Sequence, residues 1–160
     1  EVEFIHLEER ETRLKSLLLS LDRSYDFIVI DCPPSLGFMT VNALVAANSL
    51  IVPLQCEYYA MEGLGYLLNT VKLVKANLNP GLSLGGILLT MFDSRNSLAH
   101  RVTEDVRKHL GNKVFQTVIP RNVRLSESPS HGMPVILYDV KSRGATAYLE
   151  LAQEIILGEK

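Results

Sequence analysis

Short runs of apolar residues alternate along the chain with longer segments in which apolar residues recur every three or four positions. The runs predict strands at 27–30, 50–54, 84–90 and 114–119. The longer segments predict helices at 6–24, 40–47, 61–77, 98–110, 123–128 and 145–157. Because the first two runs are almost wholly apolar, they suit parallel strands that helices cover on both faces. The alternation therefore predicts an α/β fold with a mostly parallel, doubly wound sheet flanked by helices.

Turn and capping residues mark the ends of several predicted elements. The Asn-Pro-Gly turn at 79–81 ends the third helix. Ser94, Asn96 or Ser97 caps the fourth helix. The glycine pair at 85–86, inside a predicted strand, indicates close backbone packing there.

Length and composition are those of an ordinary globular protein. The 160 residues are 47% apolar and 21% charged, and a chain of this length can bury one core. No apolar run is long enough to cross a bilayer, and the acidic start of the chain has no signal-peptide pattern. Cys32 and Cys56 form no disulfide or metal-binding framework, which indicates a reducing, cytoplasmic setting.

Charge is unevenly distributed along the chain. The net charge is −2, but segment 94–125 holds seven basic residues and two acids, so it is +5 and the remainder is −7. The basic residues are Arg95, Arg101, Arg107, Lys108, Lys113, Arg121 and Arg124. Such a segment either neutralises DNA phosphates without sequence preference or forms a solvated helix face. We expect Arg107 and Lys108 to be ordinary surface charges.

A carboxylate follows the first predicted strand. Asp31 comes directly after the apolar run, and Pro33 and Pro34 stiffen the loop behind it. In doubly wound sheets ligands bind beyond the carboxyl ends of the strands. An acid at such a strand end holds Mg²⁺ beside the nucleotide phosphates in P-loop NTPases. The alternative is an Asp that only caps the next turn or helix.

Four longer motifs along the chain support the same interpretation. They are YDFIVIDCPPSLG at 25–37, PLQCEYYAMEGL at 53–64, LTMFDSR at 89–95 and IPRNVRLSESPSHG at 119–132. In this order they closely resemble the ParA/Soj family of chromosome- and plasmid-partition ATPases, in the MinD/ParA superfamily with its deviant Walker motifs. The resemblance spans most of the chain and implies a P-loop NTPase-like sheet.

The resemblance implies a nucleotide site built from distant segments. Asp31 would be the Walker B acid that holds Mg²⁺ through water. The loop that responds to the nucleotide and dimerises would contain Pro33, Pro34, Ser35 and Gly37. The adenine and ribose pocket would be lined, largely through backbone groups, by Met91, Pro120, Arg121 and Asn122.

The resemblance also implies partners. Arg95 and Arg124 match positions that the family uses to grip DNA. The complete protein would bind ATP and Mg²⁺, form a homodimer around the nucleotide and coat double-stranded DNA nonspecifically. A ParB-type centromere-binding protein would then stimulate hydrolysis. Such a protein would be bacterial, cytoplasmic and nucleoid-associated, with no membrane partner.

The chain departs from the family at the phosphate-binding loop. No G-x-x-x-x-G-K-[ST] motif occurs in the sequence. We therefore expect residues 1–160 to form a single domain, the C-terminal two-thirds of a ParA-type ATPase domain without its N-terminal third and Walker A loop. Because the loop and its lysine stabilise the transferring phosphoryl group, this chain alone should neither bind ATP tightly nor hydrolyse it.

Two other interpretations stay open. A MinD-like ATPase would attach to membranes through a basic amphipathic C-terminal helix. Segment 147–160 is instead acidic, and we expect its apolar stripe to pack on the sheet. A degenerate ParA-like interaction module without hydrolysis is favoured by the missing loop, whereas Asp31 and the 120–122 turn disfavour it.

Some conspicuous residues are expected to be structural. We predict that Cys32 is a small buried residue and that Tyr58 and Tyr59 pack in the core at a strand end. His131 is expected to order the loop that follows the 120–122 turn. The four histidines lack the spacing of a metal site.

Overall fold

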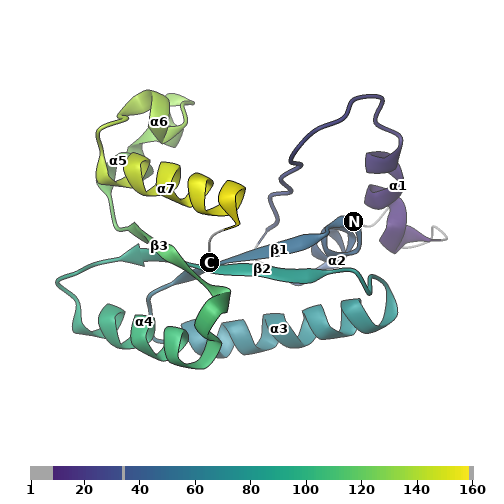
Figure 1. The fold of residues 1–160 in the computed structure, drawn as a ribbon, viewed down its shortest axis with the longest axis horizontal. Coiled ribbons are helices and arrows are strands. Elements are labelled where there is room, and N and C mark those ends of the chain that lie inside the picture. Colours follow the sequence, from purple (N-terminus) through teal and green to yellow (C-terminus); the bar gives the residue numbers. More distant parts are fainter. Residues whose placement is uncertain (1–8, 34, 159–160) are drawn as a thin grey trace. The chain divides into compact units, whose positions relative to one another are not determined.

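The computed structural model describes residues 9–33 and 35–158 (Figure 1). Contacts along the chain group these residues into two compact units. Unit 1 comprises residues 1–50 and 65–84, and unit 2 comprises residues 51–64 and 85–160. The single domain expected from the sequence stays a prediction.

The elements follow the predicted alternation closely. The first half of the chain contains η2 (Arg10–Thr12), α1 (Arg13–Leu19), α2 (Phe38–Ala46), β1 (Ser49–Gln55), α3 (Ala60–Asn77) and β2 (Ser83–Phe92). The second half contains α4 (Ser97–Leu110), η3 (Gly111–Lys113), β3 (Val114–Pro120), α5 (Val123–Glu127), η4 (Ser128–His131), α6 (Val135–Tyr138) and α7 (Arg143–Leu157). Among the described elements, η3 and α6 have no counterpart in the predicted ones, and η4 extends the helix predicted at 123–128.

The strands form a sheet in the order β1-β2-β3. β2 and β3 pair in parallel. β1 runs in the same direction as β2, because Ser83 N donates to Asn48 O at the start of the two strands and Cys56 N donates to Thr90 O at their ends. The predicted parallel α/β class is therefore confirmed.

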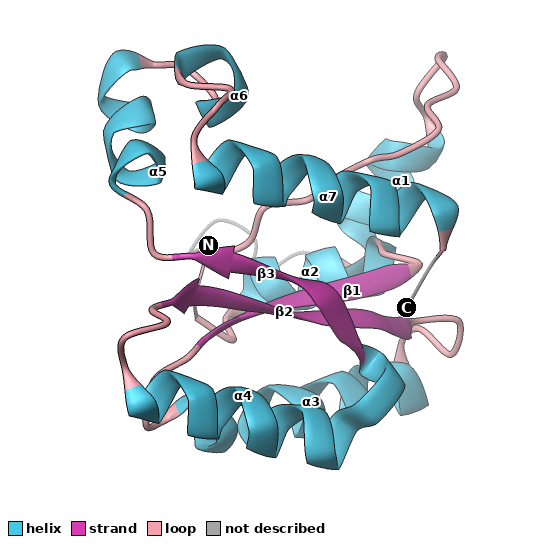
Figure 2. Cartoon of the chain, turned by 60° about the vertical axis from the view of Figure 1, so that its left-hand side comes forward, coloured by secondary structure: helices cyan, strands magenta, loops and turns pink. Residues whose placement is uncertain are grey.

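In unit 2, helices cover both faces of the β2–β3 pair, with α7 on one face and α4 on the other (Figure 2). One face is sealed by a cluster of buried side chains from β2, β3 and α7: Leu88, Phe115, Ile119, Ala147 and Leu151. The buried side chains of α4 are Ala99, Val102 and Val106. The apolar stripe of the C-terminal helix thus packs on the sheet, as predicted, and the structure is doubly wound.

The core of unit 1 joins α2 to α3 and the start of β2. Its buried residues are Leu44, Val45, Val71, Val74 and Leu82. A buried side chain, Asn79, completes the junction by donating to Leu44 O at 2.9 Å and Ala47 O at 2.8 Å. These bonds satisfy carbonyls at the C-terminus of α2, which have no partner within the helix.

The pairing of β2 with β3 is irregular in its first half. From one paired position to the next, β3 advances from Val114 to Val118 while β2 advances only from Ile87 to Leu89. The extra residues of β3 form a bulge, and bulged residues lose their ladder partners. Two charged side chains supply partners instead. Glu154 of α7 accepts from Gln116 N and Thr117 N at 2.7 and 3.0 Å.

The second of these side chains is Arg107 of α4. Its guanidinium donates to Phe115 O and Gln116 O at 3.2 and 3.1 Å. The prediction that Arg107 is an ordinary surface charge is therefore wrong, because the side chain binds the backbone of the β3 bulge. Glu154 and Arg107 together satisfy both donors and acceptors there, and Glu154 is only 7% exposed.

The close packing predicted at the glycine pair is confirmed at Gly86. A methyl group added at Gly86 would overlap the ring of Phe115, which is 1% exposed. Glycine is therefore required where β2 passes under this ring.

The first predicted strand is wrong. Residues 27–30 are extended, but they pair with no strand in the described part of the chain. Phe27 is 62% exposed and Val29 is 90% exposed. An apolar run becomes a strand only where a neighbour receives its hydrogen bonds, and the described residues supply none.

Three further expectations need correction. The helix predicted at 6–24 is shorter, since α1 ends at Leu19, and its first residues lie outside the described ones. β1 buries Val52 and Leu54 but not the alternate residues, so only one of its faces is covered. Cys32 is exposed rather than buried, because it follows the uncovered 27–30 segment.

Candidate functional site

The structure brings the ends of the strands in unit 2 together. Cys56 N donates to Thr90 O at 3.1 Å, which joins the end of β1 to β2. Phe92 pairs with Pro120, and Arg121 N donates to Phe92 O at 2.9 Å, which joins the end of β2 to the turn after β3. Ligands of such sheets bind beyond this edge. Met91 and the 120–122 turn, far apart in the sequence, thus lie on neighbouring strand ends.

Met91 has an unusual backbone. Its φ is +54°, in the left-handed region that non-glycine residues seldom adopt. β2 advances from Leu89 to Phe92 while β3 advances only from Val118 to Pro120, so Met91 lies in a second bulge. Bulges and strained residues gather next to ligand sites. Met91 therefore marks this strand end as a candidate ligand site.

Asn122 fixes the chain after β3. It is the N-cap of α5, and its side-chain oxygen accepts from Arg124 N at 2.9 Å. Because this oxygen is engaged in the cap, a ligand at the turn would meet mainly backbone groups of 120–122. The adenine and ribose pocket expected at these residues stays a prediction.

The acid and loop expected to hold Mg²⁺ and respond to nucleotide lie in unit 1. Asp31 is exposed at the end of the extended 27–30 segment and not at the end of a strand. Pro33 is exposed, and Pro34 lies outside the described residues. Ser35 O accepts from the Thr40 hydroxyl at 2.6 Å, and Gly37 is the N-cap of α2. The roles of these residues stay predictions.

Arg95, the first arginine expected to contact DNA, is paired with an acid. Its Nε and Nη2 donate to the two carboxylate oxygens of Asp93 at 3.0 and 2.8 Å. The Arg95 backbone N also donates to this carboxylate, at 3.0 Å. Hydrogen bonds from the guanidinium first, and then from the backbone, lower the pKa of Asp93 to about 2. The Arg95 side chain itself is 86% exposed.

Arg124, the second such arginine, is held by two acids. Its Nη1 lies 2.8 Å from Glu127 Oε2, and its Nε lies 3.2 Å from Asp139 Oδ2. The hydrogen bond from Arg124 lowers the pKa of Glu127. The Arg124 side chain is 50% exposed. Both candidate DNA-contacting residues therefore reach solvent already bound to carboxylates.

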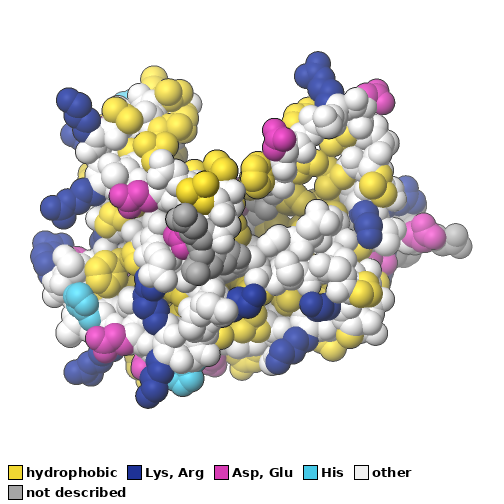
Figure 3. Space-filling model, in the orientation of Figure 1, with side chains coloured by type: hydrophobic (Ala, Val, Ile, Leu, Met, Phe, Trp, Pro, Cys, Tyr) yellow, Lys and Arg dark blue, Asp and Glu magenta, His cyan; other side chains and the backbone are white. Residues whose placement is uncertain are grey.

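The surface of unit 2 is mixed in charge. Lys and Arg side chains are spread over its α4 and α5 end, with acids between them (Figure 3). On the face that Figure 3 shows, this mixture of charges is compatible with a nonspecific phosphate contact.

Several side chains that the sequence singled out are placed by the structure. Tyr58 and Tyr59 are 74% and 73% exposed and meet edge to face, 5.1 Å apart, so the expectation of core packing is wrong. They follow the end of β1, where the chain leaves the sheet. His131 stacks on Tyr138 at 4.9 Å, in agreement with its expected role in ordering the loop.

Other kinds of site find little support in the described residues. Between residues 9 and 158, Pro34 aside, no three His, Cys, Asp or Glu side chains gather to hold a metal ion. None of the helices described is long and apolar enough to cross a membrane. A hollow of about 260 Å³ is lined by Leu21, Tyr25, Phe27 and Ile28. Among the described residues, three apolar side chains and one tyrosine line it, with no Lys or Arg.

Comparison with known proteins agrees with this geometry. A family described as an AAA domain matches residues 1–84. The sporulation initiation inhibitor protein Soj of Bacillus subtilis is 57% identical over 97% of the chain and 61% of its own length. The chromosome partitioning protein ParA of Myxococcus xanthus is 56% identical over 98% of the chain and 55% of its own length. The chain thus spans about three-fifths of the relatives it matches.

A solved structure resembles the chain as well. It is cobyrinic acid a,c-diamide synthase of Mycobacterium smegmatis with a bound ATP analogue and magnesium. Its TM-score is 0.79 at 38% identity, over 98% of the chain and 57% of that protein. The helix-covered parallel sheet, with its candidate site at the strand ends, is that of a P-loop NTPase-like α/β domain. Within this class, the chain belongs to the ParA/Soj family of AAA-type ATPase domains.

Proposed function

We propose that this protein is a chromosome-partitioning ATPase of the ParA/Soj type. In its complete form it binds ATP and Mg²⁺, dimerises around the nucleotide and coats double-stranded DNA without sequence preference. A ParB-type partner stimulates hydrolysis and so releases the protein from DNA, in a bacterial cytoplasm at the nucleoid. Relatives that are more than half identical to this chain over the aligned residues carry chromosome-partitioning names, which favours a chromosomal over a plasmid system.

One observation above all others supports the proposal that this protein binds a nucleotide. The strained Met91 lies beside the turn at 120–122, joined by the hydrogen bond from Arg121 N to Phe92 O. These segments would hold the base and ribose through backbone groups.

The residues of this chain do not form a complete binding site for the nucleotide phosphates. The sequence contains no G-x-x-x-x-G-K-[ST] loop to cradle the triphosphate. Asp31 is an exposed carboxylate that would hold Mg²⁺ through water in the complete protein. We therefore expect the 160-residue chain to show no magnesium-dependent ATP hydrolysis. Measurable turnover by the purified chain would contradict this expectation.

The DNA contact is tested by binding measurements over a series of salt concentrations. We expect the chain to bind a random-sequence duplex weakly, with an affinity that falls steeply as salt rises. Replacing Arg95 and Arg124 by alanine should weaken binding and lower the salt dependence by about one counterion for each arginine. The same pair of substitutions at the matching positions of Bacillus subtilis Soj tests the complete form. Unchanged affinity in both proteins would remove the DNA assignment.

One second candidate has an observation in its favour. A non-hydrolysing, ParA-like interaction module would need no phosphate loop, and the sequence has none. The exposed pair Tyr58 and Tyr59 would suit contact with another protein. A MinD-like membrane function is disfavoured because the apolar stripe of α7 that includes Ala147 and Leu151 packs in the core of unit 2.

A further inference from the structure

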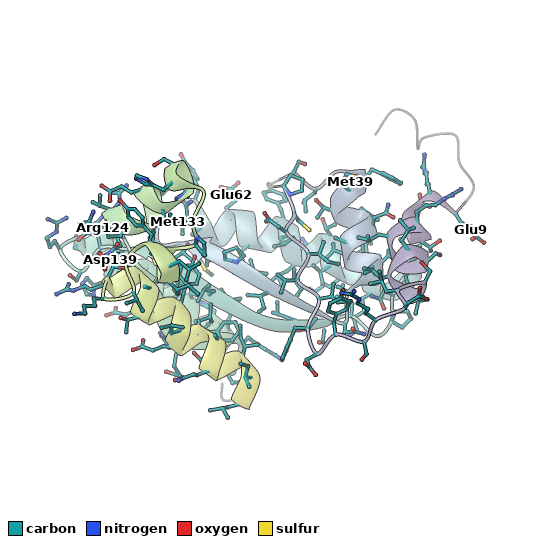
Figure 4. The ribbon with its side chains drawn as sticks, turned by 90° about the horizontal axis from the view of Figure 1, so that it is seen from above. Glu9, Met39, Glu62, Arg124, Met133 and Asp139 are labelled. Carbon is teal, nitrogen blue, oxygen red and sulfur yellow. The ribbon has the colours of Figure 1, made fainter. Side chains whose placement is uncertain are left out.

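Arg124 lies in a small polar cluster that joins α5 to α6. Glu127, Tyr138 and Asp139 surround its guanidinium, and Figure 4 shows Arg124 and Asp139 side by side. We name Glu127 and Asp139 the acid clamp. The clamp takes two of the three guanidinium nitrogens, because Nη1 binds Glu127 at 2.8 Å and Nε binds Asp139 at 3.2 Å.

The acid clamp is held by ordered neighbours. The Tyr138 hydroxyl donates to the same Glu127 oxygen that binds Arg124, at 3.3 Å, and the Tyr138 ring stacks on His131. Asp139 is fixed through its backbone, because its N–H donates to Val135 O at 2.8 Å and its carbonyl accepts from the Ser142 hydroxyl. The two carboxylates are therefore built into the α5–α7 connection.

The local charge matters for any anion that approaches Arg124. One guanidinium and two carboxylates leave the cluster with a net charge of −1, counted from the ordinary ionisation of these groups. A DNA phosphate that binds Arg124 must displace a carboxylate or lie close to one. Arg124 as it stands is a weaker phosphate contact than a free arginine would be.

We propose that Glu127 and Asp139 compete with DNA phosphate for Arg124 and thereby set the nonspecific DNA affinity of this protein. The inference rests on the proposed DNA contact at Arg124 and deepens it. Because both acids bind Arg124 directly, removing the charge of either one strengthens the contact between Arg124 and DNA phosphate. Weak binding by a single site makes the protein easy to release, as a cycling DNA-coating protein requires.

The test is a set of double-mutant cycles on the 160-residue chain, with a fluorescent random-sequence duplex and anisotropy as the readout. Glu127→Gln and Asp139→Asn are each made in the wild-type chain and in the Arg124→Ala chain. Each should tighten DNA binding about two- to fivefold in the wild-type chain, as expected for release of a surface ion pair. Neither should change the affinity measurably when Arg124 is absent.

A matched control separates competition from overall charge. Glu150→Gln removes one exposed negative charge from α7 without touching the cluster. It should tighten binding less than either clamp variant, and by the same factor with or without Arg124. Circular dichroism and thermal melting confirm that each variant is folded before its affinity is compared.

The outcomes separate the two proposals. If Arg124→Ala leaves DNA affinity unchanged, the DNA contact fails and the clamp has nothing to regulate. If Arg124→Ala weakens binding but the clamp variants tighten it no more than Glu150→Gln does, the contact stands and the competition is overturned. Weaker binding by the clamp variants also overturns it, since the acids would then position Arg124 for DNA.

Discussion

In unit 2, Ile87 and Leu89 lie on a strand paired with β3, and both side chains are fully buried. In unit 1, Ile28 and Val29 lie in an equally apolar run, yet they are 50% and 90% exposed. The two runs differ in their surroundings and not in their composition. β2 lies between two strands and packs on two helices, whereas no strand in the described part of the chain pairs with 27–30. Strand formation is thus decided by neighbours as much as by the run itself.

The largest loss of stability is expected at the β3 bulge, where the Glu154 carboxylate accepts two backbone hydrogen bonds. Glu154→Ala leaves Gln116 N and Thr117 N without their acceptor in a partly buried place. We expect the free energy of unfolding to fall by about 3 kcal/mol, measured by urea denaturation. Glu154→Gln keeps one acceptor oxygen and should lose about half as much. A loss below about 1 kcal/mol for the alanine variant would show that other groups satisfy the bulge.

A somewhat smaller effect is expected where β2 passes Phe115. Gly86→Ala places a methyl group against the ring, and the fully packed core must shift to admit it. We expect destabilisation of about 2 kcal/mol, measured by thermal or urea unfolding. The control is Gly63→Ala, near the start of α3, where the space around the glycine is open. There the helix should become more stable by about 0.5 kcal/mol.

The difference in burial between β2 and segment 27–30 can be tested by making the same substitution in each. Ile87→Val removes a buried methylene and should lower stability by about 1 kcal/mol. Ile28→Val removes the same group from a half-exposed side chain and should change stability by less than about 0.5 kcal/mol. Equal losses at the two positions would mean that 27–30 is buried in solution, against the exposure described above.

The smallest effect on stability is expected at the surface pair of Arg95 and Asp93. The pKa of Asp93 is lowered to about 2, so its carboxylate is favoured by folding. The resulting stabilisation is present above the ordinary aspartate pKa near 4 and is lost as pH falls towards 2. Arg95→Ala should raise the Asp93 pKa towards its ordinary value, measured by NMR titration of the carboxyl carbon. An unchanged pKa would mean that the backbone N–H alone holds the carboxylate.

Much of unit 2 could be predicted from the sequence, because its patterns are locally consistent. The strands at 84–90 and 114–119, the helix at 98–110 and the close approach at Gly86 all appear as predicted. Of the three capping candidates, Asn96 caps α4, since its side chain accepts from Leu98 N at 2.9 Å. Each of these features depends on near neighbours or on apolar spacing that the sequence displays directly.

The features that the sequence did not predict depend on distant partners. Nothing in the sequence around Arg107 or Glu154 indicates that both bind the β3 backbone, since the bulge that creates this need depends on the pairing with β2. The acids that bind Arg124 were missed for a similar reason. Glu127 could have been found from its spacing of three residues, but Asp139 lies fifteen residues further along the chain.

The nucleotide role of the residues at the strand ends stays a prediction, although their placement is now described. The structure places Met91 beside the turn at 120–122, as the family motifs implied. The left-handed conformation of Met91 leaves no sequence signal, because methionine seldom adopts it. Asp31 and the loop after it belong to unit 1, and their roles stay predictions.

The two charged side chains at the β3 bulge have one more consequence. A strand with vacant donors and acceptors is a template on which another molecule can build a fibril-like stack. Gln116 and Thr117 offer no such template, because a carboxylate and a guanidinium already occupy their hydrogen-bonding groups. In a protein that gathers at high local density, these three backbone groups would offer no pairing site to a neighbouring copy.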